Sequence, residues 1–199
     1  MKLILATKNA HKVVEMREIL RELEAEILSL KDIGFEGEIV EDGDTFEENA
    51  MIKARAAASA APDCIAFADD SGIAVDALGG APGIHSARYG GEACKSDRER
   101  TDLLLKNMEG KTERTAKFVC CIACVLPNGD SFVVRGECPG TLAAEYRGEG
   151  GFGYDPIFIP NGYTATMGEI SAEEKNKISH RARALELFKE ELLRRTERN

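Results

Sequence analysis

The sequence has no apolar run that approaches the ~20 consecutive residues of a membrane-spanning helix. It begins Met1-Lys2 and enters a short apolar stretch directly, without the longer apolar region of a secretory signal. We therefore expect a cytoplasmic protein with no membrane partner. The sequence also has no internal repeat and no low-complexity segment, so we expect a single domain over residues 1–199.

Positive charge is not in excess either. The chain has 26 Lys and Arg against 35 Asp and Glu, which gives a formal net charge of −9. A protein whose main partner is nucleic acid normally carries a basic face, so we expect no nucleic-acid partner. Small phosphate compounds remain compatible with a local pocket. The hydrophobic fraction of 43% is enough for a full core.

Six cysteines are present, and Cys121-x-x-Cys124 has the spacing of redox or zinc motifs. However, residues 117–126 have the composition of a strand, on which Cys120, Ile122 and Cys124 would share one face. Reduced cysteine packs as a small hydrophobic residue. We therefore interpret the six cysteines as buried free thiols.

The most informative stretch is Cys-Ile-Ala-Phe-Ala-Asp-Asp-Ser-Gly, residues 64–72. Its apolar part predicts a buried strand over residues 64–68, and Asp69-Asp70-Ser71-Gly72 predicts that the strand ends there and turns. Because side chains alternate along an extended segment, Asp69 and Asp70 should point in opposite directions. One of them would then face a site, where a carboxylate suits Mg²⁺, and the other would hold the local backbone. An ordinary turn that caps a strand is the alternative.

A second polar segment follows the first predicted strand, residues 2–6. The apolar spacing after it predicts a helix over residues 12–23. The free N–H groups at a helix start form a natural phosphate site. The segment that would form it is Thr7, Lys8, Asn9, Ala10, His11 and Lys12. The alternative is that Asn9 simply caps the helix.

Thr45-Phe46-Glu47-Glu48 has the pattern of a capping box and predicts a helix over residues 45–60. Asn49 and Lys53 lie four residues apart on it and share a face. Such a pair is either functional or simply exposed to solvent. The acidic loop before this helix contains Glu41, Asp42 and Asp44. One of these carboxylates could reach the metal, and the alternative is that all three are simply solvated.

The rest of the chain predicts further strands, helices and glycine-rich loops. The strands are expected at residues 26–30, 116–126 and 131–137, the helices from Ser96 and from Ser171, and the loops at residues 79–91 and 148–153. Asn128-Gly129 is a hairpin signal, so the sheet should contain at least one antiparallel pair. The expected apolar side of the last helix consists of Leu185, Leu187, Phe188, Leu192 and Leu193.

Phe152-Gly153-Tyr154-Asp155 follows the second glycine-rich loop. A flexible loop of this kind can close over a flat ring and hydrogen-bond its edge, although a core aromatic beside a turn is equally compatible. Lys175, His180 and Arg181 follow near predicted helix starts. The N–H groups of His180 and Arg181 suit the carbonyl oxygens of a ligand, and the alternative is that these two are surface residues.

In this order, the segments resemble those of the inosine triphosphate pyrophosphatase family of nonstandard purine nucleoside triphosphatases. The matching blocks are residues 7–12, 45–54, 68–72, 79–88, 150–156 and 179–181. The chain differs from the family pattern at Lys8, where glycine is common, and at His11, where glycine or proline appears. The resemblance implies an α/β fold with an elongated twisted mixed sheet flanked by helices, two lobes around a long nucleotide cleft, and a homodimer.

The resemblance also implies an activity. This is hydrolysis of ITP, dITP and XTP to the monophosphate and pyrophosphate with Mg²⁺, which clears these nucleotides before they enter nucleic acid. Asp70 would be a metal ligand and the catalytic proton acceptor, and Glu41 a second metal ligand. The residues implied to bind the substrate are Thr7, Lys8, Asn9, Ala10, His11, Lys12, Asn49, Lys53, Ser71, Phe152, Gly153, Tyr154, Asp155, Lys175, His180 and Arg181.

Hydrogen-bond polarity explains how such a site selects its base. Hypoxanthine and xanthine carry an oxygen at position 6, whereas adenine carries an amino group there. N–H donors from His180 and Arg181 would bond to that oxygen but not to the amino group, so the site would favour hypoxanthine and xanthine over adenine. A buried donor left unpaired costs about 1–3 kcal/mol. A phosphohydrolase that removes only the terminal phosphate and a non-catalytic nucleotide sensor remain as alternatives, and the reaction products separate them.

Overall fold

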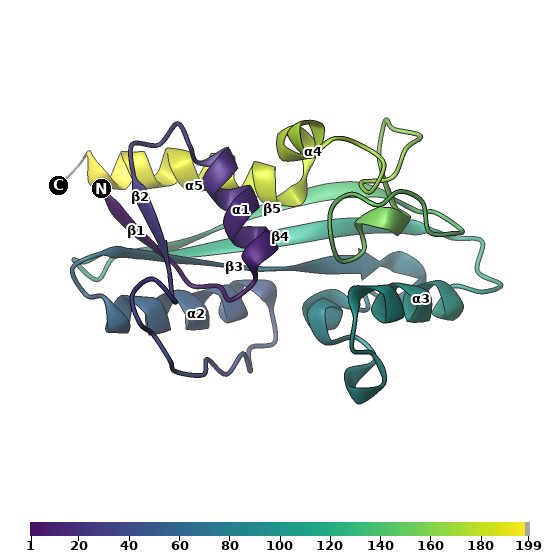
Figure 1. The fold of residues 1–199 in the computed structure, drawn as a ribbon, viewed down its shortest axis with the longest axis horizontal. Helices are drawn as coiled ribbons and strands as arrows, with labels where there is room; N and C mark the ends of the chain where they lie inside the picture. Colours follow the sequence, from purple (N-terminus) through teal and green to yellow (C-terminus); the bar gives the residue numbers. More distant parts are fainter. Residues whose placement is uncertain (198–199) are drawn as a thin grey trace. The chain divides into compact units, whose positions relative to one another are not determined.

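The computed structural model describes residues 1–197; residues 198 and 199 of the expected domain lie outside the described residues. Figure 1 shows its helices and strands. In chain order they are β1 (Lys2–Leu5), α1 (Ala10–Ile19), β2 (Glu26–Ser29), α2 (Phe46–Ala60), β3 (Ile65–Val75), α3 (Asp97–Asn107), β4 (Thr115–Val125), β5 (Ser131–Leu142), β6 (Phe158–Pro160), α4 (Ala172–Ile178) and α5 (His180–Thr196). Within this part of the chain, no helix combines the length and the apolarity that crossing a bilayer requires.

The strands form one six-stranded sheet in the order β2-β1-β3-β4-β5-β6. Strand β1 runs parallel to both β2 and β3, and β5 runs antiparallel to β6. At the predicted hairpin between β4 and β5, the Gly129 N–H donates to the Leu126 carbonyl, and Gly129 has a φ of +86°. The mixed α/β sheet with flanking helices that the sequence predicts is confirmed.

The chain divides into two compact units. The first unit contains residues 1–70, 120–136 and 181–197, and the second contains residues 71–119 and 137–180. In the first unit, α1 and α5 pack on the side of the strands opposite α2 (Figure 1). The core between the strands and these two helices is built from Leu3, Leu5, Met16, Leu20, Phe67, Ile122, Leu185 and Phe188, among others.

The second unit has a core of its own. It contains Ile73, Val75, Leu104, Met108, Phe118, Ile157 and Phe158, among others. The rings of Phe118 and Phe158 meet edge to face, with centroids 4.5 Å apart. Leu104 on α3 and Met108, which caps this helix, are almost fully buried.

Strand β3 corrects the prediction that the chain turns at Asp69-Asp70, because the strand continues to Val75. Two features explain its length. Both carboxylates have basic partners, described below, so they can lie inside a strand. After them, the absence of a side chain at Gly72 lets Ser86 approach the strand, since a Cβ on Gly72 would lie 2.4 Å from Ser86 Oγ. That hydroxyl oxygen accepts the Ile73 N–H at 2.9 Å.

The C-terminal helical region consists of two helices, α4 and α5, because Ser179 has extended backbone angles. The apolar side expected of the last helix is corrected. On α5, Leu185, Phe188 and Leu192 are buried, whereas Leu187 and Leu193 are 43% and 42% exposed. Leu185 and Leu187 are two residues apart, or about 200° around a helix, so they cannot share a face. The predicted apolar side was therefore too wide.

Some other boundaries also differ. Helix α1 starts two residues earlier than expected and ends at Ile19, β5 extends to Leu142, and the three-residue strand β6 was not predicted. The loop over residues 79–91, expected to be irregular, contains short 3₁₀ turns at Gly83–Arg88 and Gly91–Ala93. Strand β6 and the 3₁₀ turns are too short to give a periodic pattern in the sequence.

All six cysteines are free thiols, as predicted, and five of them are buried. Cys64 is the exception, because it lies just before β3 and is partly exposed. Cys120 and Cys124 belong to the core of the first unit together with Ile122. Burial raises the pKa of both thiols to about 12, so they stay protonated and act as packing residues.

The face of α5 that packs into the core gives a direct test. Leu185→Ala should lower the free energy of unfolding by about 2–5 kcal/mol, because it removes a fully buried side chain. Leu187→Ala on the exposed face is the matched control and should change it by less than about 1 kcal/mol. Urea denaturation measures both, and equal losses would contradict the assignment of the buried face.

Candidate active site

The residues predicted to act on a substrate lie in both units, and each group is described by itself. In the first unit, the carboxylate–lysine cluster consists of Lys12, Glu15, Glu41, Lys53, Asp69, Asp70 and Arg181. In the second unit, the aromatic loop consists of residues 151–155 and is accompanied by Lys175. The two groups differ in chemistry, because the first is almost entirely charged.

Asp69 is the buried anchor of the carboxylate–lysine cluster. Its Oδ2 lies 2.8 Å from Lys12 Nζ on α1 and 3.4 Å from Arg181 Nη2 on α5. Arg181 also donates from Nη1 to Glu15 Oε2 at 2.6 Å. Burial by itself raises the pKa of Asp69, but the charges of Lys12 and Arg181 outweigh it and hold the pKa well below the ordinary value. Asp69 is therefore ionised and ties α1, β3 and α5 together.

Asp70 points to different partners, as the alternation along β3 predicts. Its Oδ1 lies 3.3 Å from Lys53 Nζ on α2, and the same ammonium lies 2.6 Å from Glu41 Oε2. Burial raises the pKa of Asp70 in spite of the opposing charges of Lys53 and Lys12. A carboxylate with a raised pKa is a better proton acceptor near neutral pH than an ordinary aspartate.

Lys53 stays protonated in this environment. Burial lowers its pKa, but the carboxylates of Asp69, Asp70 and Glu41 outweigh burial and raise it. The ammonium therefore holds two acidic side chains, Glu41 and Asp70, next to each other. Without it, their mutual repulsion would favour protonation of one of them.

Asn49 holds the loop that carries Glu41. Its side chain is 1% exposed, Oδ1 accepts the Gly43 N–H at 2.9 Å, and Nδ2 donates to the Gly43 carbonyl at 3.4 Å. Thr45 caps α2 as predicted, and Glu48 Oε2 accepts the Asp44 N–H at 2.7 Å. The Asn49–Lys53 pair is thus not simply exposed to solvent. Asn49 positions the backbone, and Lys53 positions the carboxylates.

The residues around Asp70 fit a magnesium ion. Asp70 Oδ2 is buried and has no hydrogen-bond partner among residues 1–197. A hard cation would satisfy that oxygen, and Glu41 supplies a second carboxylate beside the same ammonium. The described part of the chain holds no group of three or more His, Cys, Asp or Glu suited to a metal ion. Mg²⁺ usually takes one or two carboxylates and completes its shell with water and phosphate oxygens, so two carboxylates are enough.

The start of α1 is capped by Asn9. Its Oδ1 accepts the N–H groups of His11 and Lys12 at 3.0 and 3.3 Å, and Thr7 Oγ1 accepts the Asn9 N–H at 3.2 Å. The exposed Lys8 donates to the Gly37 carbonyl at 3.3 Å, and Ala10 is the first residue of the helix. The capping alternative is therefore confirmed. Two N–H groups that we expected to be free for phosphate are bonded within the chain.

In the second unit, Asp155 organises the aromatic loop. Its Oδ2 accepts the Phe152 N–H at 2.8 Å and lies 2.6 Å from Lys175 Nζ. The Lys175 ammonium also lies 4.7 Å from the centre of the Phe152 ring, in cation–π contact. Lys175, which the resemblance implies to bind the substrate, contacts the side chain of Asp155 and the ring of Phe152.

Tyr154 and His180 are both buried, at 6% and 5% exposure. The Tyr154 hydroxyl donates to the Ser86 carbonyl at 2.7 Å, and burial raises its pKa. For this tyrosine the core alternative is confirmed. The His180 ring stacks on Phe118 with centroids 4.6 Å apart, so it is not a surface residue. Ser71 follows Asp70 in β3 and is partly buried.

Sequence reasoning missed several residues that hold these groups in place. Glu15 follows Lys12 by three residues on α1, and this spacing places both on one helix face, which was a usable signal. Ser86, Asp97 and Thr101 contact the strand or the aromatic loop from elsewhere in the second unit. No local pattern links them to it, because those contacts form only in the folded chain.

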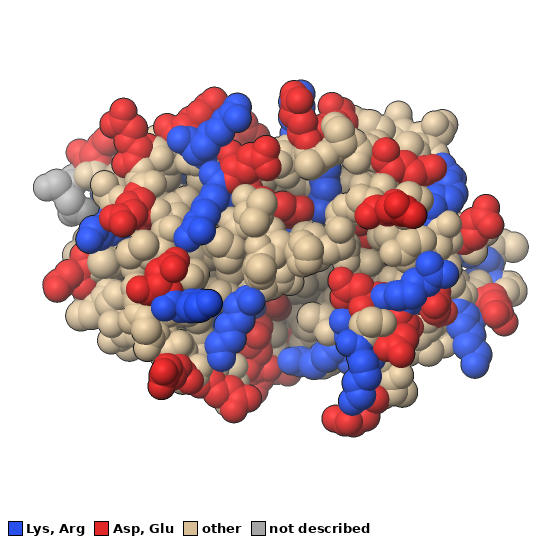
Figure 2. Space-filling model, in the orientation of Figure 1, with Lys and Arg blue, Asp and Glu red and all other residues tan. Residues whose placement is uncertain are grey.

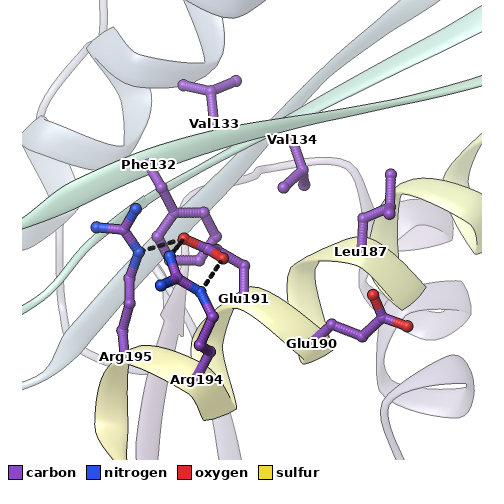
Figure 3. A pocket seen from close by; sticks show the side chains of 8 residues that line it. All are labelled: Phe132, Val133, Val134, Leu187, Glu190, Glu191, Arg194 and Arg195. Atoms are coloured by element: carbon purple, nitrogen blue, oxygen red, sulfur yellow. Dashed lines mark hydrogen bonds and ion pairs between the residues drawn. The ribbon is translucent and has the colours of Figure 1, made fainter. Parts of the chain in front are cut away.

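The surface offers two further observations. On the face shown in Figure 2, lysine and arginine side chains are interspersed with acidic ones. A groove of about 430 Å³ lies between β5 and α5, and its lining includes Phe132, Val134 and Leu187 (Figure 3). Its arginines, Arg194 and Arg195, both donate to Glu191, and Arg195 also pairs with Asp130. None of the predicted site residues lines it.

The sheet and the carboxylate–lysine cluster define an α/β protein with a polar site on a central strand. Residues 3–191 match the model of the Ham1 family, and the chain belongs to this family. It is 49% identical over 184 residues to a dITP/XTP pyrophosphatase of Bacillus subtilis (strain 168), covering 92% of each chain. This confirms the resemblance noted from the sequence.

Solved structures give the same result. The Staphylococcus aureus Ham1 protein is 38% identical, with a TM-score of 0.86 and coverage of 96% of this chain and 98% of that one. A HAM1 protein from Coxiella burnetii is 40% identical, with a TM-score of 0.88 and coverage of 98% and 99%. The chain therefore shares its fold with Ham1 proteins over nearly its whole length.

The two neighbouring aspartates should respond in opposite ways to the same substitution. Asp69→Asn leaves Lys12 and Arg181 without their buried counter-charge and should lower the free energy of unfolding by about 3–5 kcal/mol at pH 7. Burial raises the pKa of Asp70, which means that its ionised form destabilises the folded state. Asp70→Asn removes this buried charge, so the melting temperature should rise.

The pH dependence distinguishes the two as well. The pKa of Asp69 is lowered in the folded state, so its stabilisation is present above the ordinary value of 3.8 and is lost as the pH falls through the folded pKa. The difference in stability between Asp69→Asn and wild type should therefore have its full size at neutral pH and should become smaller only below about pH 4. Thermal melts at several pH values measure this, and a difference that stays constant into acid would contradict the assignment.

Proposed function

We propose that this chain hydrolyses nonstandard purine nucleoside triphosphates, namely ITP, dITP and XTP, to the monophosphate and pyrophosphate. This activity clears such nucleotides from the pool before they enter nucleic acid. One observation carries the proposal: the Bacillus subtilis relative that is 49% identical over 92% of the chain is named a dITP/XTP pyrophosphatase. The carboxylate–lysine cluster supplies groups that this chemistry needs.

The triphosphate needs positive charge within an acidic protein. Lys12 and Lys53 provide it on the two sides of β3, and each is held in place by a carboxylate of that strand. Glu41 and Asp70 would hold Mg²⁺, which supplies charge neutralisation and polarisation of the phosphate oxygens when bound. At the start of α1, a phosphate oxygen would take over the N–H groups of His11 and Lys12 from Asn9 Oδ1.

Asp70 acts as the proton acceptor. A water molecule attacks the α-phosphorus, its proton passes to the Asp70 carboxylate, and the bond between the α-phosphorus and the bridging oxygen breaks, with its electron pair leaving on pyrophosphate. The raised pKa of Asp70 supports this role. Lys53 stabilises the negative charge that develops on the phosphate oxygens.

The family resemblance assigns a further set of residues to the base. Phe152 stacks on the purine. Lys175 holds the ring of Phe152, and Asp155 holds the backbone of Phe152. His180 and Arg181 donate to the oxygen at position 6, which adenine lacks. Tyr154 and Gly153 shape the loop around the ring. In this proposal Lys175 contributes positive charge near the nucleotide while it is paired with Asp155.

We also propose that the protein is a homodimer that acts in the cytoplasm. The family resemblance supports the first statement, and an activity on the nucleotide pool supports the second. Size-exclusion chromatography with light scattering on the purified protein tests the first, and a monomer at micromolar concentration would refute it.

Product analysis tests the main proposal. Purified protein is incubated with ITP, XTP, GTP and ATP, with Mg²⁺ and with chelator, and pyrophosphate and phosphate are measured separately. We expect pyrophosphate from ITP and XTP, little from ATP, and none with chelator. Phosphate as the sole product would move the chain to the terminal phosphohydrolases. Tight binding without any product would make it a nucleotide sensor.

Asp70→Asn should reduce kcat for ITP by about 10²–10⁴-fold, because the proton acceptor is lost. Binding of ITP, measured by calorimetry, should persist, since Lys12 and Lys53 remain. Unchanged turnover would remove Asp70 from the mechanism.

Glu41→Gln should raise the Mg²⁺ concentration needed for half-maximal activity by about tenfold or more, because one charged oxygen ligand is lost. Asp42→Asn changes the neighbouring, exposed acid of the same loop and is the matched control, with no expected shift. If both variants shift equally, the loop's charge matters and Glu41 is not a ligand.

A further inference from the structure

We propose that Asp97 and Thr101 on α3 are positioning residues for recognition of the base. They fix the backbone of Gly153 and thereby hold the ring of the adjacent Phe152 in place. The inference rests on the proposed function, in which Phe152 stacks on the purine, and assigns a role to one face of α3.

Asp97 and Thr101 hold both polar backbone groups of Gly153. The Gly153 N–H donates to Asp97 Oδ2 at 2.9 Å, and Thr101 Oγ1 donates to the Gly153 carbonyl at 3.3 Å. The two residues are four positions apart, so they share a face of α3. One helix face therefore fixes the residue next to Phe152 from both sides of its backbone.

Helix α3 is itself firmly held. Ser96 and Glu99 form a complete capping box at its start. Asp97 Oδ1 accepts from Arg100 Nη2 at 2.9 Å, which leaves Oδ2 oriented toward Gly153. Thr101 is fully buried, and Leu104, one turn further along the helix, lies in the core of the second unit. The two side chains thus start from a rigid element.

The loop needs this support because its own backbone is unusual. Gly153 has a φ of +59° and Gly151 a φ of +70°, values that favour glycine and give the segment little rigidity of its own. Phe152, between them, is partly exposed. Its N–H donates to Asp155, and Lys175 lies over its ring. These contacts hold the loop at Phe152 and Asp155, and α3 holds it at Gly153.

This arrangement predicts a selective defect. An aromatic ring that is already in position loses less conformational entropy when a base stacks on it. Loosening the loop should therefore weaken binding of the nucleoside part and leave the phosphate-binding groups of the first unit unchanged. Inorganic tripolyphosphate has the phosphates without a base, so it separates the two effects.

The test uses Thr101→Val and Asp97→Ala, which each remove one contact to Gly153. Their conservative partners, Thr101→Ser and Asp97→Asn, keep a hydroxyl or an amide oxygen at the same place. Asp102→Ala is the matched control on α3, since it breaks only the exposed pair that Asp102 forms with Arg98 at 3.0 Å. Pyrophosphate release from ITP gives kcat and KM, and tripolyphosphate is measured as a competitive inhibitor.

For Thr101→Val and Asp97→Ala we expect KM for ITP to rise by about tenfold, because a backbone group loses its partner. We expect kcat to stay within about twofold and inhibition by tripolyphosphate to stay unchanged. The Ser, Asn and Asp102→Ala variants should behave like wild type. An unchanged KM in both variants, or an equal loss toward ITP and tripolyphosphate, would overturn the inference. Wild type that releases no pyrophosphate from ITP would instead defeat the proposed function.

A second readout does not depend on activity. The chain contains no tryptophan, so Phe152→Trp introduces a single fluorophore at the loop. Adding Thr101→Val or Asp97→Ala to this variant should increase acrylamide quenching and lower fluorescence anisotropy, whereas adding Asp102→Ala should change neither. Quenching and anisotropy that are identical in Phe152→Trp with and without these additional substitutions would overturn the inference.

Discussion

The ion pairs of the buried Asp69 carboxylate hold the first unit together around β3. Lys12 and Arg181 reach it from α1 and α5, which are far apart in the sequence. Asp69 and Arg181 are buried and Lys12 is largely so; such charges are costly to desolvate, and their mutual attraction offsets that cost only if their geometry is kept. The strand is therefore fixed relative to both helices, and the neighbouring Asp70 is fixed with it.

Two adjacent aspartates thus have opposite roles. Asp69 is ionised and stabilises the fold, whereas burial raises the pKa of Asp70 and makes its ionised form costly. A group kept in an unfavourable environment is typical of functional sites, where stability is lost in exchange for reactivity. The alternation of a β-strand is sufficient to separate them, because it directs one carboxylate toward α1 and α5 and the other toward α2.

Much of this could be predicted from the sequence, and the reasons for the failures are physical. Periodicity and capping patterns identified α1, α2, α3 and most of the sheet, since those signals are local. The turn predicted at Asp69-Asp70 was wrong because acidic residues normally leave a strand, and nothing local reveals the basic partners that keep them in it. The 3.6-residue period should have excluded Leu187 from the buried face of α5.

The site followed the same rule. Alternation correctly gave Asp69 and Asp70 different surroundings, whereas the shared helix face of Asn49 and Lys53 left open whether this pair is exposed to solvent. Yet the contacts of Asn49 with Gly43, and of Thr101 with Gly153, depend on which loops meet in the folded chain. Spacing along the sequence carries no information about such meetings.

The cap at the start of α1 has a thermodynamic consequence. Asn9 Oδ1 already accepts the N–H groups of His11 and Lys12. A phosphate oxygen that binds there replaces one acceptor by another, so the number of hydrogen bonds is conserved and the net gain comes mainly from charge. Binding becomes an exchange that is readily reversed, because the amide oxygen can take back both N–H groups when the anion leaves. At this end of α1, a phosphate would therefore compete with the Asn9 side chain for both N–H groups.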